Sequence, residues 1–241
     1  MTQNILIIGA NGGIARALID QICAAPQTQV YTVSRHEYAN KHTNQLHTEL
    51  DSSDELQVQA FVRNLLDQKI RLDQVICTTG VLHTSGNVQL KPEKRLEDIN
   101  ASQLAEYFRV NTIVPALWMK QLVKVLNKEK ASVVFFSARV GSISENELGG
   151  WYGYRASKAA LNMLVKTASV EYKRRLPNVS LACYHPGTVD TELSKPFQSN
   201  VKPGKLFTAD FTATQLLKHI ATLEAEKSPY YFDWDGQTIA Y

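Results

Sequence analysis

The chain has 241 residues, of which 44% are hydrophobic and 20% charged, and these proportions are typical of a globular protein rather than a disordered one. The 26 basic and 23 acidic residues give a net charge of +3, which is too small and too scattered to indicate binding to nucleic acid. The length fits one large α/β domain better than two, so we expect a single domain over residues 1–241.

The cysteines and the apolar runs indicate where in the cell the protein is located. Cys23, Cys77 and Cys183 are odd in number and lack the spacing of a disulfide framework or a zinc site, so we expect free buried thiols and no metal. The first apolar run, Ile5–Ile8, is too short for a signal peptide, and no run approaches the roughly 18 residues of a membrane span. These features predict a cytoplasmic protein that binds no membrane.

Apolar runs rich in β-branched residues alternate with segments of helical periodicity. In chain order, the sequence predicts a strand at 5–8, a helix at 14–23, strands at 30–33 and 46–50, a helix that starts within 51–54 and reaches 66, and a strand at 75–77. It then predicts a helix at 104–126 interrupted or kinked near Pro115, a strand at 132–136, a helix at 152–176, a strand at 179–184, a helix at 213–223 and a strand at 230–234.

The alternation indicates an α/β fold: one Rossmann-like, doubly wound parallel sheet of about seven strands, with helices on both faces. The polar residues 190–204 predict a mobile loop with little regular structure, and we expect a loop over about residues 190–210 to close over a substrate.

Glycines cluster between the first strand and the first helix, where residues 9–15 read GANGGIA. Gly9 permits a tight turn, and the next two glycines let the backbone approach a pyrophosphate at the N-terminus of the helix. An ordinary glycine-rich turn would look the same in isolation. Its place between an apolar strand and an amphipathic helix favours a dinucleotide site made by Gly9, Asn11, Gly12, Gly13 and Ile14.

The end of the second predicted strand bears on the choice of nicotinamide cofactor. An NAD site needs a carboxylate there to bind the ribose 2′-OH, whereas this strand ends in Ser34 and Arg35. Arg35 could pair with a 2′-phosphate and Ser34 could hydrogen-bond it, which favours NADP(H). Glu37 lies close enough to keep NAD(H) as the alternative.

Tyr154 and Lys158 lie four residues apart in a predicted helix, so the phenol and the ammonium share one face. An ordinary tyrosine has a pKa of about 10, and a nearby cation lowers it. The phenol can then give a proton to a carbonyl oxygen, or take one from an alcohol, while hydride passes to or from the nicotinamide. Tyrosine and lysine occur four residues apart on many helices by chance, so the pair indicates a catalytic site only if further motifs accompany it.

Those motifs resemble the short-chain dehydrogenase/reductase family from residue 5 to about residue 191. They are the glycine turn, with Ala15 in place of the family's third glycine, the asparagine at 111, the run from Tyr154 to Leu161, and PGTVDT at 186–191. The resemblance implies that Asn111 holds a proton-relay water and that Lys158 binds the nicotinamide ribose. It also implies cofactor contacts for Asp51, which is equally a candidate helix cap, and for Gly80, Pro186, Gly187, Val189 and Thr191.

The catalytic serine is the main departure from the family's pattern. The family's Ser-Ser-x-x-Gly is SARVG at 137–141, which puts Ala138 where the substrate-polarising hydroxyl belongs. Ser137 is our candidate for that hydroxyl, although neighbours on a strand point to opposite faces. Ser142 and Ser144 are alternatives. Trp151, Tyr152, Phe197 and Phe207 are candidates for an apolar pocket wall, or for packing.

The segment from Gly141 to Tyr154 resembles sniffer-type carbonyl reductases and bacterial C-factor cell-contact signalling proteins. We therefore expect an NADP(H)-dependent enzyme that interconverts a small-molecule carbonyl and alcohol, with Tyr154 as general acid/base. The alternative, supported by Ala138, is a cofactor-binding regulatory or signalling protein of the same fold with weak or no turnover. The resemblance also implies a homodimer or homotetramer formed through the two long helices.

Overall fold

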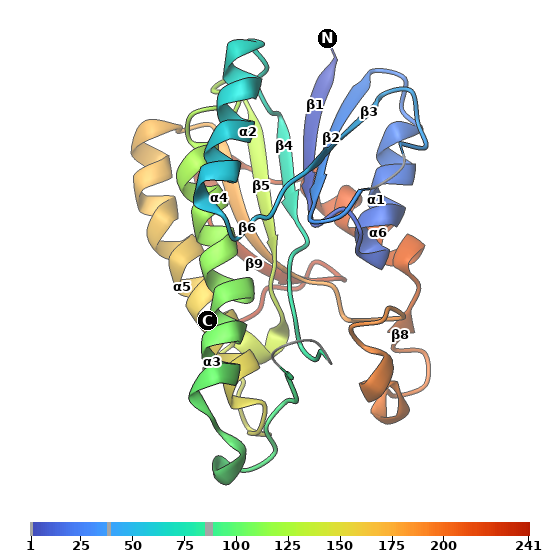
Figure 1. Cartoon of the computed structure of the whole chain (residues 1–241), viewed down its shortest axis with the longest axis vertical. Helices are drawn as coiled ribbons and strands as arrows, with labels where there is room; N and C mark the ends of the chain where they lie inside the picture. Colours follow the sequence, from blue (N-terminus) through green and yellow to red (C-terminus); the bar gives the residue numbers. More distant parts are fainter. Residues whose placement is uncertain (1, 38–39, 85–88) are drawn as a thin grey trace.

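A seven-stranded sheet forms the centre of the molecule, and all its strands run parallel. The computed structural model describes residues 2–37, 40–84 and 89–241. The strand order is β3-β2-β1-β4-β5-β6-β9, so the order switches from one half of the sheet to the other between β1 and β4 (Figure 1). Ligands bind beyond the carboxyl ends of the strands at such a switch point. The strands are β1 (Gln3–Ile8), β2 (Thr28–Ser34), β3 (Gln45–Glu49), β4 (Gln74–Cys77), β5 (Ala131–Phe136), β6 (Val179–His185) and β9 (Tyr230–Asp233).

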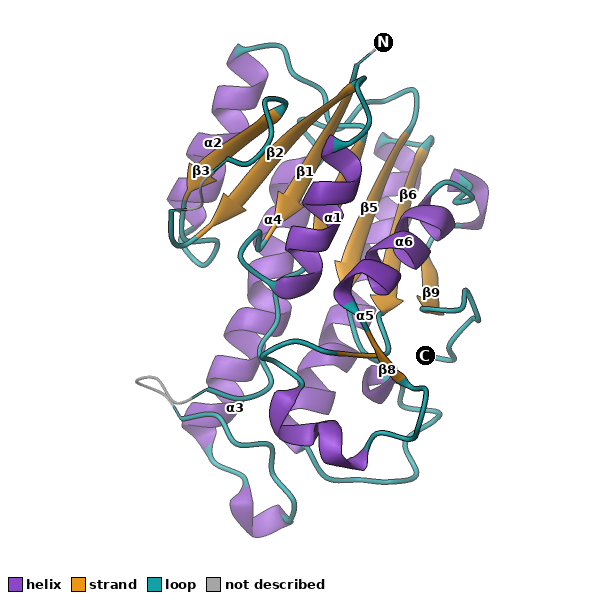
Figure 2. Cartoon of the chain, turned by 90° about the vertical axis from the view of Figure 1, so that its right-hand side faces the viewer, coloured by secondary structure: helices purple, strands orange, loops and turns teal. Residues whose placement is uncertain are grey.

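Helices cover both faces of the sheet and enclose two apolar cores. On one face lie α1 (Gly13–Cys23) and α6 (Ala209–Ile220), and on the other lie α2 (Glu55–Asp67), α4 (Val114–Leu122) and α5 (Tyr152–Arg175) (Figure 2). The central strands are buried on both faces, which is why they read as continuous apolar runs in the sequence. The predicted fold class is confirmed.

The long helix predicted over residues 104–126 is interrupted near Pro115, as expected. α3 (Ala101–Phe108) passes into a π-helical turn at Arg109–Ile113 and continues as α4. Pro115 is the second residue of α4, which directly follows the π-helical turn, so its missing N–H leaves a carbonyl of that turn without its helical donor. The interruption therefore takes the form of a π-helical turn next to the proline, and such turns are frequent at functional sites. This one carries Asn111.

The segment 190–204, predicted as a mobile loop with little regular structure, contains a 3-10 helix, so the expected lack of regular structure is wrong, while the mobility stays a prediction. β7 (Thr188–Val189) pairs in parallel with β8 (Leu206–Phe207), and a 3-10 helix at Lys195–Asn200 lies between them. Ser194 and Gln198 hydrogen-bond to each other and to neighbouring groups of the same segment. Short-range contacts of this kind leave no periodic pattern of apolar residues, which is why the sequence does not predict them.

The cysteines and the last helix also test the sequence predictions. Cys23, Cys77 and Cys183 are buried and free, as expected. α6 begins at Ala209, earlier than predicted, because the Thr208 hydroxyl caps it by accepting a hydrogen bond from a backbone N–H of its first turn. Among residues 2–37, 40–84 and 89–241, no helix has both the length and the hydropathy needed to cross a bilayer.

Candidate active site

The glycine turn lies at the switch point and touches two other strand ends. Gly9 has a φ of +88°, and a Cβ there would lie 2.8 Å from Thr78 Oγ1, so only glycine fits between β1 and the end of β4. Thr78 Oγ1 in turn donates to the Ile8 carbonyl at 2.9 Å. A Cβ on Gly13 would lie 3.1 Å from Thr191 Cγ2. The turn after β6 is thus brought against the start of α1.

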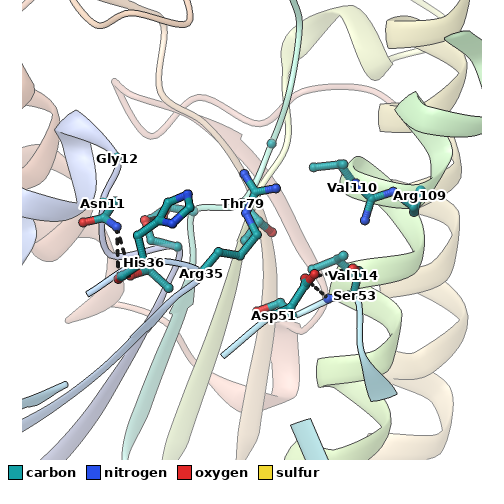
Figure 3. A pocket seen from close by; sticks show the side chains of 15 residues that line it. Asn11, Gly12, Arg35, His36, Asp51, Ser53, Thr79, Arg109, Val110 and Val114 are labelled. Atoms are coloured by element: carbon teal, nitrogen blue, oxygen red, sulfur yellow. Dashed lines mark hydrogen bonds between the residues drawn. The ribbon is translucent and has the colours of Figure 1, made fainter. Parts of the chain in front are cut away.

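Two hollows flank this turn. A polar pocket of about 220 Å³ lies at the carboxyl ends of β1, β2 and β4 (Figure 3). A larger cavity of about 640 Å³ lies between the start of α5, the ends of β5 and β6, and the segment after β7. Of the predicted cofactor residues, the polar pocket is lined by Gly9, Asn11, Gly12, Ser34, Arg35, Asp51 and Gly80. The larger cavity is lined by Ile14, Tyr154, Pro186, Gly187, Val189 and Thr191.

Ser34 and Arg35 both line the polar pocket, but of the two only the Ser34 side chain is hydrogen-bonded to a residue that the structure describes. The Ser34 hydroxyl donates to the His36 carbonyl at 2.8 Å and accepts from Asn11 Nδ2 at 3.1 Å, so it fixes the turn after β2. Arg35 is exposed and reaches into the pocket (Figure 3), and among the described residues no carboxylate lies within ion-pair distance of it. Its guanidinium is available to an anion.

The sequence predicts that Asp51 either contacts the cofactor or caps the following helix, and the structure excludes the second role, because Asp51 does not cap α2. The cap is Asp54, whose carboxylate accepts from the backbone N–H groups of Leu56 and Gln57. Asp51 lines the polar pocket, where it accepts from the N–H and the hydroxyl of Ser53, both at 2.8 Å. Burial acts to raise the pKa of Asp51, but these hydrogen bonds and the charges of two nearby arginines hold the pKa below its usual value.

Asn111 links the end of β4 to α5. Its Oδ1 accepts from the Val81 N–H at 2.8 Å, and its Nδ2 donates to the Val81 carbonyl and to Ser157 Oγ, both at 3.0 Å. A Cβ on Gly80 would lie 3.3 Å from Lys158 Nζ and 3.5 Å from Asn111 Oδ1. Glycine at 80 therefore lets the chain pass directly over both side chains, as the predicted grouping requires.

Tyr154 and Lys158 lie together but do not hydrogen-bond. The ammonium is 5.9 Å from the centroid of the Tyr154 ring and donates to the Phe136 carbonyl at 2.8 Å. Lys158 is only 2% exposed, and burial lowers its pKa from 10.5 to about 8. Burial raises the pKa of Tyr154, whereas the sequence prediction expects the cation to lower it. At this separation the loss of hydration outweighs the attraction of the ammonium.

The serines differ in their access to Tyr154. Ser137 and Ala138 line the same cavity as Tyr154. Ser137 is buried, and its Oγ donates to Asn162 Oδ1 at 2.6 Å, so its proton is already held. Neither Ser142, which accepts from the Glu145 N–H, nor the other candidate at 144, which donates to a C-terminal carbonyl, lines the cavity.

Aromatic side chains form one wall of the larger cavity. Trp151 packs against Phe197 at 5.1 Å and against Tyr154 at 6.1 Å between ring centroids. Of the four predicted wall residues, Trp151 and Phe197 line the cavity. Tyr152 does not, and neither does Phe207, which packs against another tryptophan.

Glu93 is a residue of this site that sequence reasoning missed. Its carbonyl accepts from the N–H of Trp151, which has a left-handed φ of +52°, and its carboxylate accepts from the Gly153 N–H at 3.2 Å. A Cβ on Gly153 would lie 2.5 Å from the Tyr107 ring and 2.9 Å from Glu93 Oε1. A buried acid from a distant segment thus anchors the first turn of α5, where anions are favourable, and so places Trp151 and Tyr154. A glycine inside a predicted helix start is the only local signal.

Comparisons with known proteins agree with this geometry. The model of a family described as short chain dehydrogenase matches residues 3–202. A dehydrogenase of Rhodococcus sp. strain AD45, named for 1-hydroxy-2-glutathionyl-2-methyl-3-butene, is 28% identical over 243 residues, covering 99% of this chain and all of that protein. C-signal of Myxococcus xanthus is 29% identical over 147 residues, 61% of this chain and 83% of that protein. The structure of the carbonyl reductase Sniffer of D. melanogaster matches the whole of both chains with a TM-score of 0.84 at 22% identity.

Proposed function

This chain belongs to the short-chain dehydrogenase/reductase family of oxidoreductases, and from that premise we propose that it interconverts a carbonyl and an alcohol with NADP(H), using Tyr154 as general acid/base. The observation that carries the proposal is the cavity shared by Tyr154 and the turn at 186–191, with the buried Lys158 ammonium 5.9 Å from the Tyr154 ring centroid and the glycine turn beside the cavity. The Rhodococcus relative is named a dehydrogenase of a hydroxy compound, which supports the reaction class.

The residues present fit a dinucleotide. Gly9, with its positive φ, lines the polar pocket together with Arg35, and Gly13 packs against Thr191, which lines the larger cavity, so the glycine turn adjoins both. The nicotinamide, when bound, supplies or accepts the hydride. We propose that the cofactor is held by Gly9, Asn11, Gly12, Gly13, Ile14, Ser34, Arg35, Asp51, Gly80, Tyr154, Lys158, Pro186, Gly187, Val189 and Thr191.

In the direction of reduction, the Tyr154 phenol donates its proton to the carbonyl oxygen as the carbonyl carbon gains hydride, and in oxidation it accepts the proton of the alcohol. Lys158 supports the charge on the phenolate oxygen left after donation. Asn111 positions a relay water that restores the proton. Ser137 orients the substrate oxygen once its hydroxyl turns from Asn162.

We further propose that residues 1–241 form one dinucleotide-binding domain, with the segment at about 190–210 covering the substrate. Assembly as a homodimer or homotetramer through the two long helices stays a prediction, as does a cytoplasmic location.

Replacing Arg35 with alanine tests the cofactor assignment. The free guanidinium would form charge-assisted hydrogen bonds with a 2′-phosphate, so Arg35→Ala should weaken NADPH binding by about 10- to 100-fold and leave NADH binding within about twofold. Fluorescence titration with both nucleotides measures this. Arg63, which is exposed on α2 away from the polar pocket, provides the matched control, Arg63→Ala. Equal weakening of NADPH and NADH by Arg35→Ala would contradict the assignment.

A second candidate function is a cofactor-binding regulatory protein with weak or no turnover. Ala138 and the commitment of the Ser137 proton to Asn162 favour it, because alanine has no hydroxyl and the hydroxyl at 137 already donates to another side chain. The relative named C-signal is similar over part of the chain.

Ala138→Ser separates the two functions. Adding the missing donor is expected to raise kcat for NADPH-dependent carbonyl reduction by about 10- to 100-fold, since losing one such donor typically costs about 10²–10³ in rate. Ser137→Ala provides the comparison at the neighbouring position. If the wild type binds NADPH but neither it nor Ala138→Ser consumes NADPH with any carbonyl in a panel, the regulatory function is the correct one.

A further inference from the structure

The charges around the larger cavity are not balanced. Among the residues that the structure describes, five side chains that are charged at neutral pH line it, and Glu145 is the only acid of the five. Glu145 is already paired with Arg139 at 3.1 Å, and Arg139 also pairs with Asp233 at 2.7 Å. His185 adds no positive charge at neutral pH, because burial and the nearby Arg139 lower its pKa to about 4. The cations left over are Arg155, Lys202 and Lys205.

None of these three cations has an acidic partner. In the described part of the chain, no carboxylate lies within ion-pair distance of any of them. Arg155 follows Tyr154 directly on α5. Its Nε donates to the Gly150 carbonyl at 3.0 Å and its Nη1 donates to the Val140 carbonyl at 3.5 Å, which holds the side chain on the cavity lining and leaves Nη2 and the second N–H of Nη1 for an anion. The Lys205 ammonium lies 4.9 Å from the Trp234 ring centroid and has no anion of its own.

Apolar surface adjoins the three cations. Trp151 and Phe197 form the aromatic wall beside Tyr154. Leu148 and Leu193, which are 93% and 39% exposed, stand on the same lining. Exposed apolar side chains gathered on a cavity rim are typical of a ligand-binding site. The cavity therefore presents an apolar wall next to a proton donor, with uncompensated positive charge at its edge.

We propose that the substrate is anionic: an apolar body lies against Trp151 and Phe197 with its carbonyl at Tyr154, and a remote carboxylate or phosphate is bound by Arg155, Lys202 and Lys205. This inference rests on the proposed function, and it adds the class of substrate. Arg155 is the anchor, because its guanidinium is held by Gly150 and can bind two oxygens of one oxyanion at once. The two lysines come from the segment before β8, so an anion would also join that segment to α5.

Matched carbonyl probes test the proposal. 4-Oxo-4-phenylbutanoate, its uncharged methyl ester and the corresponding 4-oxo-4-phenylbutyl phosphate share one aryl ketone and differ in charge. We expect the wild type to show a kcat/KM at least about 10-fold higher for the acid or the phosphate than for the ester, with the difference mainly in KM, since hydrogen bonds between charged groups are stronger than those to an uncharged ester. The two anions together distinguish a carboxylate site from a phosphate site. The preference should shrink as salt rises, because exposed cations are screened.

Substitutions of the three cations test whether they cause the preference for anionic probes. Arg155→Ala should reduce the acid-to-ester ratio of kcat/KM by about 10-fold or more, and the double variant Lys202→Ala/Lys205→Ala by several-fold, whereas Arg155→Lys keeps part of it because the charge remains. Using a ratio removes any general loss of folded enzyme. Lys195→Ala is the matched control, because Lys195 lies on the same segment, is paired with Glu192 and does not line the cavity.

The outcomes separate this inference from the proposed function. Turnover of the acid, the phosphate and the ester at equal kcat/KM, or a preference for an anion that survives in Arg155→Ala, overturns the anionic substrate and leaves the oxidoreductase standing. If no probe is turned over, the proposed function is in question, and calorimetric titration of the three probes into the NADPH-loaded protein still decides the inference. Tighter binding of the acid or the phosphate than of the ester, lost in Arg155→Ala, supports it, and equal binding of all three overturns it.

Discussion

Tyr154→Phe is expected to lower kcat for carbonyl reduction by about 10³-fold while leaving NADPH binding within about threefold, because it removes the proposed proton donor and leaves the ring and the other proposed cofactor contacts in place. The Tyr154 hydroxyl makes no hydrogen bond to another described residue. Phenylalanine keeps the edge-on packing with Tyr107 at 6.2 Å and with Trp151 at 6.1 Å. Stopped-flow or steady-state measurement of NADPH oxidation gives the rate of carbonyl reduction, and fluorescence titration gives the affinity for NADPH.

Tyr152→Phe is the control for this variant, because Tyr152 lies on the same helix but does not line the cavity. A Tyr154→Phe enzyme that retained the wild-type rate would end the assignment of Tyr154 as general acid. The pH profile offers a second check. Since burial raises the pKa of Tyr154, the phenol stays protonated through the neutral range, so the rate of reduction should not fall between about pH 6 and pH 8 through loss of that proton.

Lys158→Met is expected to lower kcat/KM by at least about 10²-fold and, at the same time, to stabilise the free protein at pH 7 by about 1–3 kcal/mol. The activity falls because the cation that supports the phenolate is gone. The stability rises because Lys158, only 2% exposed, has no carboxylate partner within the described residues and a single carbonyl as its acceptor. Methionine fills a similar volume without the cost of burying a charge.

The gain in stability should depend on pH in a defined direction. Burial lowers the pKa of Lys158 from 10.5 to about 8, so between these two values the folded state binds fewer protons than the unfolded state. The wild type therefore becomes more stable as pH rises through this window, and the advantage of Lys158→Met is full below about pH 8 and shrinks toward pH 10.5.

Urea unfolding of the wild type and Lys158→Met at pH 7 and pH 9.5 measures this dependence. Lys173→Met, at an exposed position near the end of the same helix, serves as the control and should change the free energy of unfolding by less than about 0.5 kcal/mol at either pH. If Lys158→Met were less stable than the wild type at pH 7, the buried ammonium would be contributing to the fold rather than costing it stability.

The two predictions together describe a site maintained at a cost to the fold. Lys158 is buried among Cys77, Cys183 and the end of β5, where an apolar side chain would pack with less desolvation. Glu93 is 1% exposed, and one of its carboxylate oxygens has no hydrogen-bond partner within the described residues. The Lys158 ammonium lies 5.9 Å from the Tyr154 ring centroid, and the Glu93 carboxylate bonds to the N–H of the preceding residue, Gly153. Two costly buried groups next to the proposed proton donor are what a functional site would retain.

The sequence alone determined the sheet, most of the helices and the order of the motifs. Continuous apolar runs are what a parallel strand covered on both faces requires, so β1, β4, β5 and β6 could be predicted within a few residues. The glycine turn and the Tyr-x-x-x-Lys pair are local patterns, so their places at a strand end and on one helix face followed directly from spacing. The small segment β7 to β8 could not be predicted in this way, because side chains within it bond to one another without any periodicity.

Only the tertiary structure decided which side chains meet. Ser137 donates to Asn162, Lys158 donates to the carbonyl of Phe136, and Glu93 anchors the turn that begins at Trp151. Each pair is separated by more than 20 residues and belongs to different elements, so no pattern within one element records it. The same is true of the unpaired cations, since a sequence lists charges but only packing shows which of them lack a partner. Contacts between elements depend on how the helices and loops pack against the sheet, and residues from all parts of the chain contribute to that packing.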